Sequence, residues 1–294
     1  MNQNEICHLK KRHFKKLAQN ASMVSQNLQE EAIHQFRVEY KKIRTFLRLS
    51  SINLSADKVV KISKKLKRWY NVLGHLRDLQ LLHHRVIAAF ELQQVKPQGY
   101  INLIENDFFK FKYGLPIKSI HTAVKTNQKK INKFFLKKIS KSNYLKFVTQ
   151  KLLMVYEVLL KGDLDDYDFH AVRKYLKDIF YCLAIEKMSL SDIVPSTIFN
   201  STNDSFLKLL LDELGKFQDL STAIILLKSA SLDSFNLEEQ NMLIQLNQQW
   251  AQEKEQLRNN LNSILTGENR TALHSYVAVI ANFSSNEKPA DPVE

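Results

Sequence analysis

The sequence predicts an all-α protein, and three observations support this. Apolar residues recur at helical spacing along almost all of the 294-residue chain, and no segment alternates convincingly as a strand would. Only 6 glycines and 5 prolines are present, too few for the frequent turns of a β-rich fold. Apolar residues make up 44% of the chain, so it can bury a sizeable core and is not a disordered chain.

The helical period divides the chain into ten amphipathic segments. We predict helices over residues 5–26, 30–50, 56–92, 100–113, 117–139, 143–161, 168–188, 204–230, 237–265 and 269–283. Residues 97–99 and 114–116 contain the Gly and Pro expected at helix breaks. Residues 162–168 form an acidic link near the midpoint, and residues 284–294 have the composition of a frayed tail.

Two further signals mark helix ends near the carboxyl terminus. Asn236 is followed three residues later by Glu239, the spacing of a capping box at a helix start. Gly267 suits the position just after a helix end.

The charge distribution predicts an anionic partner. Residues 1–150 hold 30 Lys and Arg against 9 Asp and Glu, a net of +21, whereas residues 151–294 have a net of −8. A field of one sign over half of a molecule is typical of proteins that bind nucleic acid, a membrane surface or a polyanion such as polyphosphate. A solvated basic surface would explain the net charge but not its uneven distribution.

The sequence also excludes several classes of protein. Cys7 and Cys182 are too few for a disulfide framework or a thiolate zinc site. The first residues lack the apolar core of a signal peptide, and no run approaches 18 apolar residues. No Gly-rich phosphate loop, activated nucleophile or Mg²⁺-binding carboxylate cluster is recognisable. We therefore predict a cytoplasmic protein that is not an enzyme, with no metal, cofactor or membrane partner.

An internal repeat crosses the midpoint of the chain. The segment from Ile33 to Lys41 and the segment from Phe169 to Lys177 share an apolar-His-x-apolar-Arg pattern. Farther along, the sequence LGHLRDL at 73–79 is matched by LGKFQDL at 214–220. Two ordered matches at similar offsets favour a duplicated helical bundle, with residues 1–161 as the first half and 162–283 as the second.

These repeated motifs, His-x-x-Arg-x-x-x-Lys followed by Leu-Gly-x-x-Arg-Asp, resemble those of the CHAD family, the conserved histidine α-helical domain. The resemblance implies duplicated antiparallel helical bundles, related by a pseudo-two-fold axis, with a basic central groove. It also implies non-catalytic binding of inorganic polyphosphate, and polyphosphate granules as one place where such a protein could gather. The second half departs from the pattern, because Phe180 and Gln218 stand where Arg44 and Arg77 stand in the first half.

A basic stripe on the predicted helix 30–50 is the first candidate site. Five side chains fall within about 80° of arc along about 21 Å of helix, and they are His34, Arg37, Lys41, Arg44 and Arg48. The stripe borders the apolar face instead of opposing it, as expected for residues that line a groove. Phe36, Tyr40 and Phe46 are predicted to point away from it, which favours a polyanion without bases over nucleic acid.

A second group of residues ranks behind this stripe. It comprises Lys61, Lys64, Lys65 and Arg68 on the following predicted helix, and His170, Arg173, Lys174 and Lys177 in the second half.

Two plainer interpretations of these basic residues and histidines remain open at this point. The stems of the basic residues could simply cover apolar surface, and His34 and His170 could serve only as bonding groups inside the bundle. Gly74 and Gly215 predict close helix crossings, and Arg77 and Asp78 predict bonds between helices. A non-specific nucleic-acid-binding module is the alternative function.

Overall fold

The computed structural model describes residues 1–55, 58–91, 95–117, 119–133, 138–192, 204–266 and 271. Within these ranges the regular elements are helices, and no strand is present, which confirms the all-α prediction. The α-helices are α1 (Gln3–Asn27), α2 (Glu30–Ser50), α3 (Lys64–Ala89), α4 (Gln98–Gly114), α5 (Ser119–Asn132), α6 (Lys141–Leu159), α7 (Asp166–Glu186), α8 (Asp204–Ser229) and α9 (Leu237–Thr266). None of the described helices is long and apolar enough to cross a bilayer.

Contacts divide the chain into two compact units. Unit 1 combines residues 1–140 with 219–255, and unit 2 combines residues 141–218 with 256–294. These units are defined by contacts between residues. The predicted halves, 1–161 and 162–283, were instead defined by the sequence repeat, and that division remains a prediction. Three predicted features lie outside the described residues. They are Gly267, the tail at 284–294, and the helix 269–283 except for one residue.

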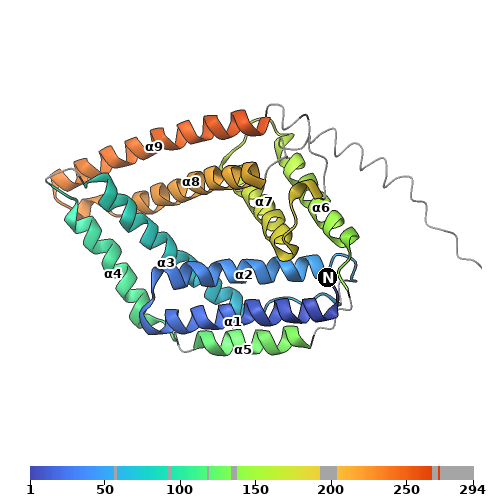
Figure 1. Cartoon of the computed structure of the whole chain (residues 1–294). Helices are drawn as coiled ribbons and strands as arrows, with labels where there is room; N and C mark the ends of the chain where they lie inside the picture. Colours follow the sequence, from blue (N-terminus) through green and yellow to red (C-terminus); the bar gives the residue numbers. More distant parts are fainter. Residues whose placement is uncertain are drawn as a thin grey trace, which may run out of the picture. The chain divides into compact units, whose positions relative to one another are not determined.

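In unit 1, α1 packs against α2 and α5, and α3 packs against α2, α4 and α5 (Figure 1). The apolar faces of these amphipathic helices meet in a core that includes the fully buried Phe14, Phe36 and Leu66. Burying such side chains contributes about 1.5–3 kcal/mol each. The packed face of α2 is therefore fixed in orientation, and its polar side chains take defined places along the edge of that face.

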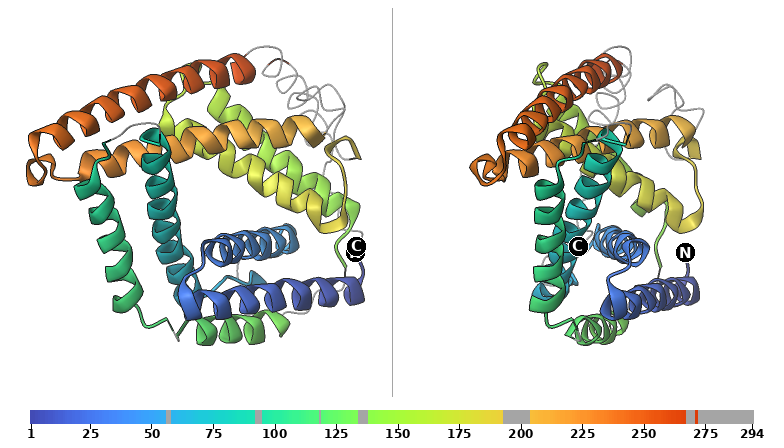
Figure 2. Two further views of the ribbon diagram at one scale, coloured as in Figure 1. Left: turned by 60° about the vertical axis from the view of Figure 1, so that its left-hand side comes forward. Right: turned by 90° about the vertical axis from the view of Figure 1, so that its left-hand side faces the viewer.

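Unit 2 has its own apolar core. Helices α6 and α7 lie side by side, as the turned views in Figure 2 also show. Phe169 of α7 and Phe217 of α8 are both buried and lie 4.8 Å apart between ring centroids. Leu261 and Leu265 of α9 belong to the same cluster.

Most helix boundaries lie within about two residues of those predicted, and the largest differences occur around α3 and α5. Helix α3 begins at Lys64, because Ser63 caps it by accepting a hydrogen bond from Leu66 N. Ser63 N in turn donates to Asn127 Oδ1, 64 residues away. The prediction of helix from residue 56 was therefore wrong for residues 58–63, and Lys61 precedes the helix instead of lying on it.

The predicted capping interaction at the start of α9 is present in part. The backbone N–H of Glu239 donates to Asn236 Oδ1 at 2.8 Å. The Glu239 carboxylate does not complete the box. It accepts instead from Tyr100 N at 2.8 Å, at the first turn of α4. A Cβ on Gly99 would lie 2.8 Å from Glu239 Oε2, so glycine at this position leaves room for the carboxylate.

Candidate anion-binding site

The basic stripe predicted on α2 lies along one edge of that helix, within unit 1. His34 and Arg48 are exposed, while Arg37, Lys41 and Arg44 are half-buried. The neighbouring Ile33, Phe36 and Tyr40 are buried. The stripe therefore borders the packed face, as its angular position predicted, and we call the five residues the α2 ladder.

Arg37 of the α2 ladder is held by the neighbouring helix α3. Its Nη1 donates to the backbone carbonyl of Tyr70 on α3 at 3.0 Å. Within the described part of the chain this carbonyl is its one hydrogen-bond partner, and no carboxylate lies within ion-pair distance. The charge of Arg37 lowers the pKa of Asp78, but no bond joins the two side chains, so the half-buried guanidinium keeps donors that can bind an anion.

The Tyr70 ring supports Arg37 from the side of α3. The Arg37 guanidinium carbon lies 4.7 Å from the centroid of the Tyr70 ring. Tyr70 stacks in turn on Tyr40, with centroids 4.2 Å apart and planes 18° apart. Sequence reasoning did not find Tyr70, although it lies four residues before Gly74 and so on the same face of α3. An aromatic ring thus touches the ladder, and Tyr40, which was predicted to point away from the ladder, stacks on that ring. Phe36 and Phe46 are buried.

Gly74 makes room for the Arg37 guanidinium. A Cβ at Gly74 would overlap with Arg37 Nη1. The close approach that this glycine predicted is thus made by the motif arginine of the neighbouring helix. Arg37 belongs to the His-x-x-Arg motif, and Gly74 belongs to the Leu-Gly motif 37 residues later. The two motifs therefore meet in one contact between α2 and α3.

His34 stands beside other positive charges. Partial burial lowers its pKa, and the positive charge of Arg77 on α3 lowers it further. Lys41 and Arg37 act in the same direction, while Glu31 opposes them. His34 is therefore neutral near pH 7, in a place where an arriving anion would favour its protonation.

Arg77 bonds between helices, as predicted. Its Nη1 donates to Glu30 Oε2 on α2 at 3.2 Å and to Gln80 Oε1 at 3.4 Å. Asp78 is not part of this ion pair. Burial raises the pKa of Asp78, and Asp219 raises it further, against the lowering effect of Arg37.

The second group of candidate residues in unit 1 is exposed. Lys64, Lys65 and Arg68 lie in the first turns of α3, and Lys61 lies in the segment before it. The carbonyl of Lys61 accepts from Lys130 Nζ of α5 at 3.0 Å. Because cations at a helix start oppose the helix dipole, this cluster is electrostatically unfavourable without a bound anion.

In unit 2 the corresponding motif residues repeat part of this arrangement. Arg173 Nη2 would lie 3.6 Å from a Cβ on Gly215, and its Nε is buried without a hydrogen-bond partner in the described residues. The exposed His170 is bonded through Nδ1 to Gln218 Oε1 at 2.7 Å. The ammonium groups of Lys174 and Lys177 lie about 6 Å from neighbouring aromatic ring centroids.

The two glycines should respond differently to alanine. At Gly215 the nearest side-chain atom would be at an ordinary contact distance, so Gly215→Ala should stabilise the protein by up to about 1 kcal/mol through helix propensity. Gly74→Ala must displace the Arg37 guanidinium from the Tyr70 carbonyl, which offsets that gain. Urea unfolding of both variants against the wild type measures this. Equal stabilisation by both changes would show that the contact at Gly74 carries no energy.

No three His, Cys, Asp or Glu side chains within the described ranges gather closely enough to hold a metal ion. The chemistry visible on α2 and α3 is that of cations anchored by carbonyls and aromatic rings. Such groups can hold a phosphate by charge and hydrogen bonds.

Comparisons with known proteins agree with the sequence motifs. Residues 9–104 match the family model of the CHAD domain, which confirms the resemblance. The fold is similar to the crystal structure of the CHAD domain from the plant Ricinus communis, with a TM-score of 0.57 and 15% identity over 95% of this chain and 92% of that one. At this identity the likeness shows the fold alone. No curated protein gives a match.

Proposed function

From the premise that residues 9–104 match the CHAD domain, we propose that this protein binds inorganic polyphosphate without chemical change, through the α2 ladder. One observation carries the proposal. Arg37 is half-buried, is fixed by the Tyr70 carbonyl and Gly74, and has no acid partner in the described residues. Polyphosphate would give this guanidinium a directly bonded anionic acceptor without requiring any base-specific contact.

The shape of the ladder favours a linear polymer over a small metabolite. Three Arg and one Lys follow one another along the helix edge, so successive phosphates can meet planar forks and a compact charge. A small metabolite would need a closed and mostly apolar pocket. The exposed cations Lys64, Lys65 and Arg68 on α3 extend the basic surface of unit 1.

The duplicated arrangement is part of the same proposal. Arg173 lies against Gly215 as Arg37 lies against Gly74, which supports an internal repeat. We propose that His170, Arg173, Lys174 and Lys177 contribute a weaker phosphate-binding surface on unit 2. We also propose a cytoplasmic location, as the sequence predicts, with polyphosphate granules as one place of assembly.

Competition between polymers tests the function. Polyphosphate should displace a labelled single-stranded oligonucleotide of equal total charge, and its affinity should rise with chain length. Affinity should fall steeply with salt, because each neutralised phosphate releases counterions. Fluorescence titrations at about 150 mM salt measure both effects. Equal affinity for the two polymers would contradict specific binding and support the nucleic-acid alternative.

One observation favours that alternative at a different place. On α4 the rings of Phe109 and Tyr113 stack, and the Lys112 ammonium lies within 6 Å of both centroids. Tyr113 is 78% exposed, so a base could stack on it. Loss of oligonucleotide binding in Tyr113→Ser, with polyphosphate binding unchanged, would assign nucleic acid to α4 and polyphosphate to α2.

The lowered pKa of His34 predicts a pH dependence of binding. A bound polyanion favours the charged imidazolium, so polyphosphate binding takes up a proton at His34. Affinity should therefore rise as pH falls through the pKa of the complex, and level off below the lowered pKa of the free protein. Titrations from about pH 8 to about pH 5 with one polymer measure this. His34→Gln should remove the His34 part of the slope; an unchanged slope would show that this histidine does not meet phosphate.

A further inference from the structure

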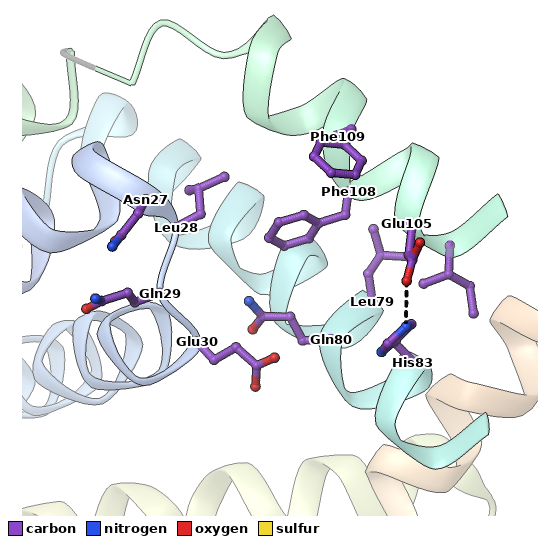
Figure 3. A pocket seen from close by; sticks show the side chains of 11 residues that line it. Asn27, Leu28, Gln29, Glu30, Leu79, Gln80, His83, Glu105, Phe108 and Phe109 are labelled. Carbon is purple, nitrogen blue, oxygen red and sulfur yellow. Dashed lines mark hydrogen bonds and ion pairs between the residues drawn. The ribbon is translucent and has the colours of Figure 1, made fainter. Parts of the chain in front are cut away.

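A pocket of about 420 Å³ in unit 1 has a chemistry opposite to that of the α2 ladder. Its lining comes from the α1–α2 turn, from α3 and from α4, as Figure 3 shows. The apolar part consists of Leu28, Leu79, Ile104, Phe108 and Phe109. A volume of this size is within the range of small-molecule sites.

The charged lining of this pocket is acidic. Glu30 and Glu105 line it, and no Lys or Arg is among the described lining residues. This is notable in a half of the chain whose net charge is +21. Two carboxylates repel phosphate, so the pocket is unsuited to the polyanion and attracts a cation.

One carboxylate oxygen of Glu105 is available to a ligand. Its Oε1 lies 3.2 Å from His83 Nε2, the contact marked by the dashed line in Figure 3. Its other oxygen makes no hydrogen bond to any described residue. Glu30, by contrast, uses one oxygen for Arg77 and the other for His84, each at 3.2 Å. Glu105 is therefore the carboxylate best placed to receive a ligand ammonium.

Gln80 supplies a second polar group. It is 94% buried, and its carboxamide oxygen accepts from Arg77. Its carboxamide nitrogen has no acceptor among the residues described, and Figure 3 shows the group between Glu30 and Phe108. This nitrogen is not among the buried atoms that lack a partner, so water in the pocket can reach it, and an occupant that offers an oxygen would replace that water as its acceptor.

We propose that this pocket binds a small organic ammonium compound with an aromatic or aliphatic body and a hydroxyl or carbonyl oxygen. The body lies against Phe108, Phe109 and the aliphatic lining. The ammonium group bonds to Glu105, with further attraction from the aromatic faces. The ligand oxygen accepts from Gln80. This site is separate in residues and in charge from the proposed polyphosphate site.

A matched pair of probes tests the proposal. Tyramine carries an ammonium and a phenol hydroxyl, and 3-(4-hydroxyphenyl)propionate has nearly the same shape with the opposite charge. Isothermal titration calorimetry of the full chain should detect tyramine binding, and binding of the propionate should be at least about tenfold weaker. Equal binding of the two, or no tyramine binding up to about 10 mM, would overturn the proposal.

Two variants locate the binding. Glu105→Gln should weaken tyramine at least about tenfold, because a charge-assisted hydrogen bond is lost. Glu31→Gln removes the same charge from an exposed residue that does not line the pocket, and should leave tyramine affinity within about twofold. Similar losses in both variants would show a general charge effect and contradict this site. Polyphosphate binding should be unchanged in Glu105→Gln, so the two proposals fail independently.

Discussion

Reversing two charges of the α2 ladder should abolish polyphosphate binding. Lys41→Glu combined with Arg48→Glu removes two phosphate contacts and adds two repulsive charges on the same helix edge. Charge-assisted hydrogen bonds contribute about 1.5–3 kcal/mol each, so affinity should fall at least about a hundredfold. Arg37 is left in place, because its bond to the Tyr70 carbonyl also holds α2 against α3. Fluorescence titration with one polyphosphate length gives the result.

The matched control for this double variant lies on α5. Lys125→Glu with Lys129→Glu makes the same change of net charge at two exposed residues of unit 1. It should weaken binding only through the long-range field, by less than about tenfold. Lys130 is a poorer control, because its ammonium bonds to the Lys61 carbonyl. If both double variants lose affinity equally, net charge alone explains binding and the ladder is not a site.

The largest loss of stability should follow removal of His13. On α1, His13 Nδ1 lies 2.6 Å from Glu39 Oε2 of α2, and both side chains are buried. Lys42 holds the other carboxylate oxygen at 3.0 Å. His13→Leu leaves Glu39 buried with one partner fewer, which should cost about 3–5 kcal/mol in the free energy of unfolding.

Two companion measurements isolate the cause of that loss. The double variant His13→Leu with Glu39→Leu leaves no buried charge and should recover most of the stability. Burial alone would raise the pKa of Glu39, but hydrogen bonds from His13 and Lys42 outweigh it and lower that pKa. The wild type should therefore lose stability as pH falls below about 4 through the lowered pKa, and the double variant should lose less. A single variant as stable as the wild type would refute this account.

The helices could be predicted because amphipathic periodicity is a local property of the sequence. The range 30–50, for example, agrees at both ends with α2. The start of α3 could not be predicted, because it depends on Asn127 binding Ser63 from another helix. Likewise α5 ends at Asn132, short of the predicted 139, where Ile139 instead bonds to the backbone of Met1. At the start of α3 a distant partner thus decides a local boundary.

The candidate site could also be predicted only as far as it depends on residues of one helix. Helical angles placed the ladder beside the buried face, and the structure agrees for all five residues of α2. Angles on one helix carry no information about what the facing helix presents. The Tyr70 carbonyl, the Tyr70 ring and the space at Gly74 therefore emerged only from the packing of α2 on α3.

The bond from Glu239 to the start of α4 bears on the order in which the chain can fold during synthesis. Tyr100 leaves the ribosome 139 residues before the carboxylate that caps its helix. Until that carboxylate arrives, water must satisfy the first turn of α4, and residues 1–140 lack the 219–255 segment of their unit. A fragment that ends at residue 104, where the family match ends, would thus lack both the Glu239 carboxylate and the 219–255 segment. Expression studies of shortened chains should retain residues through 255.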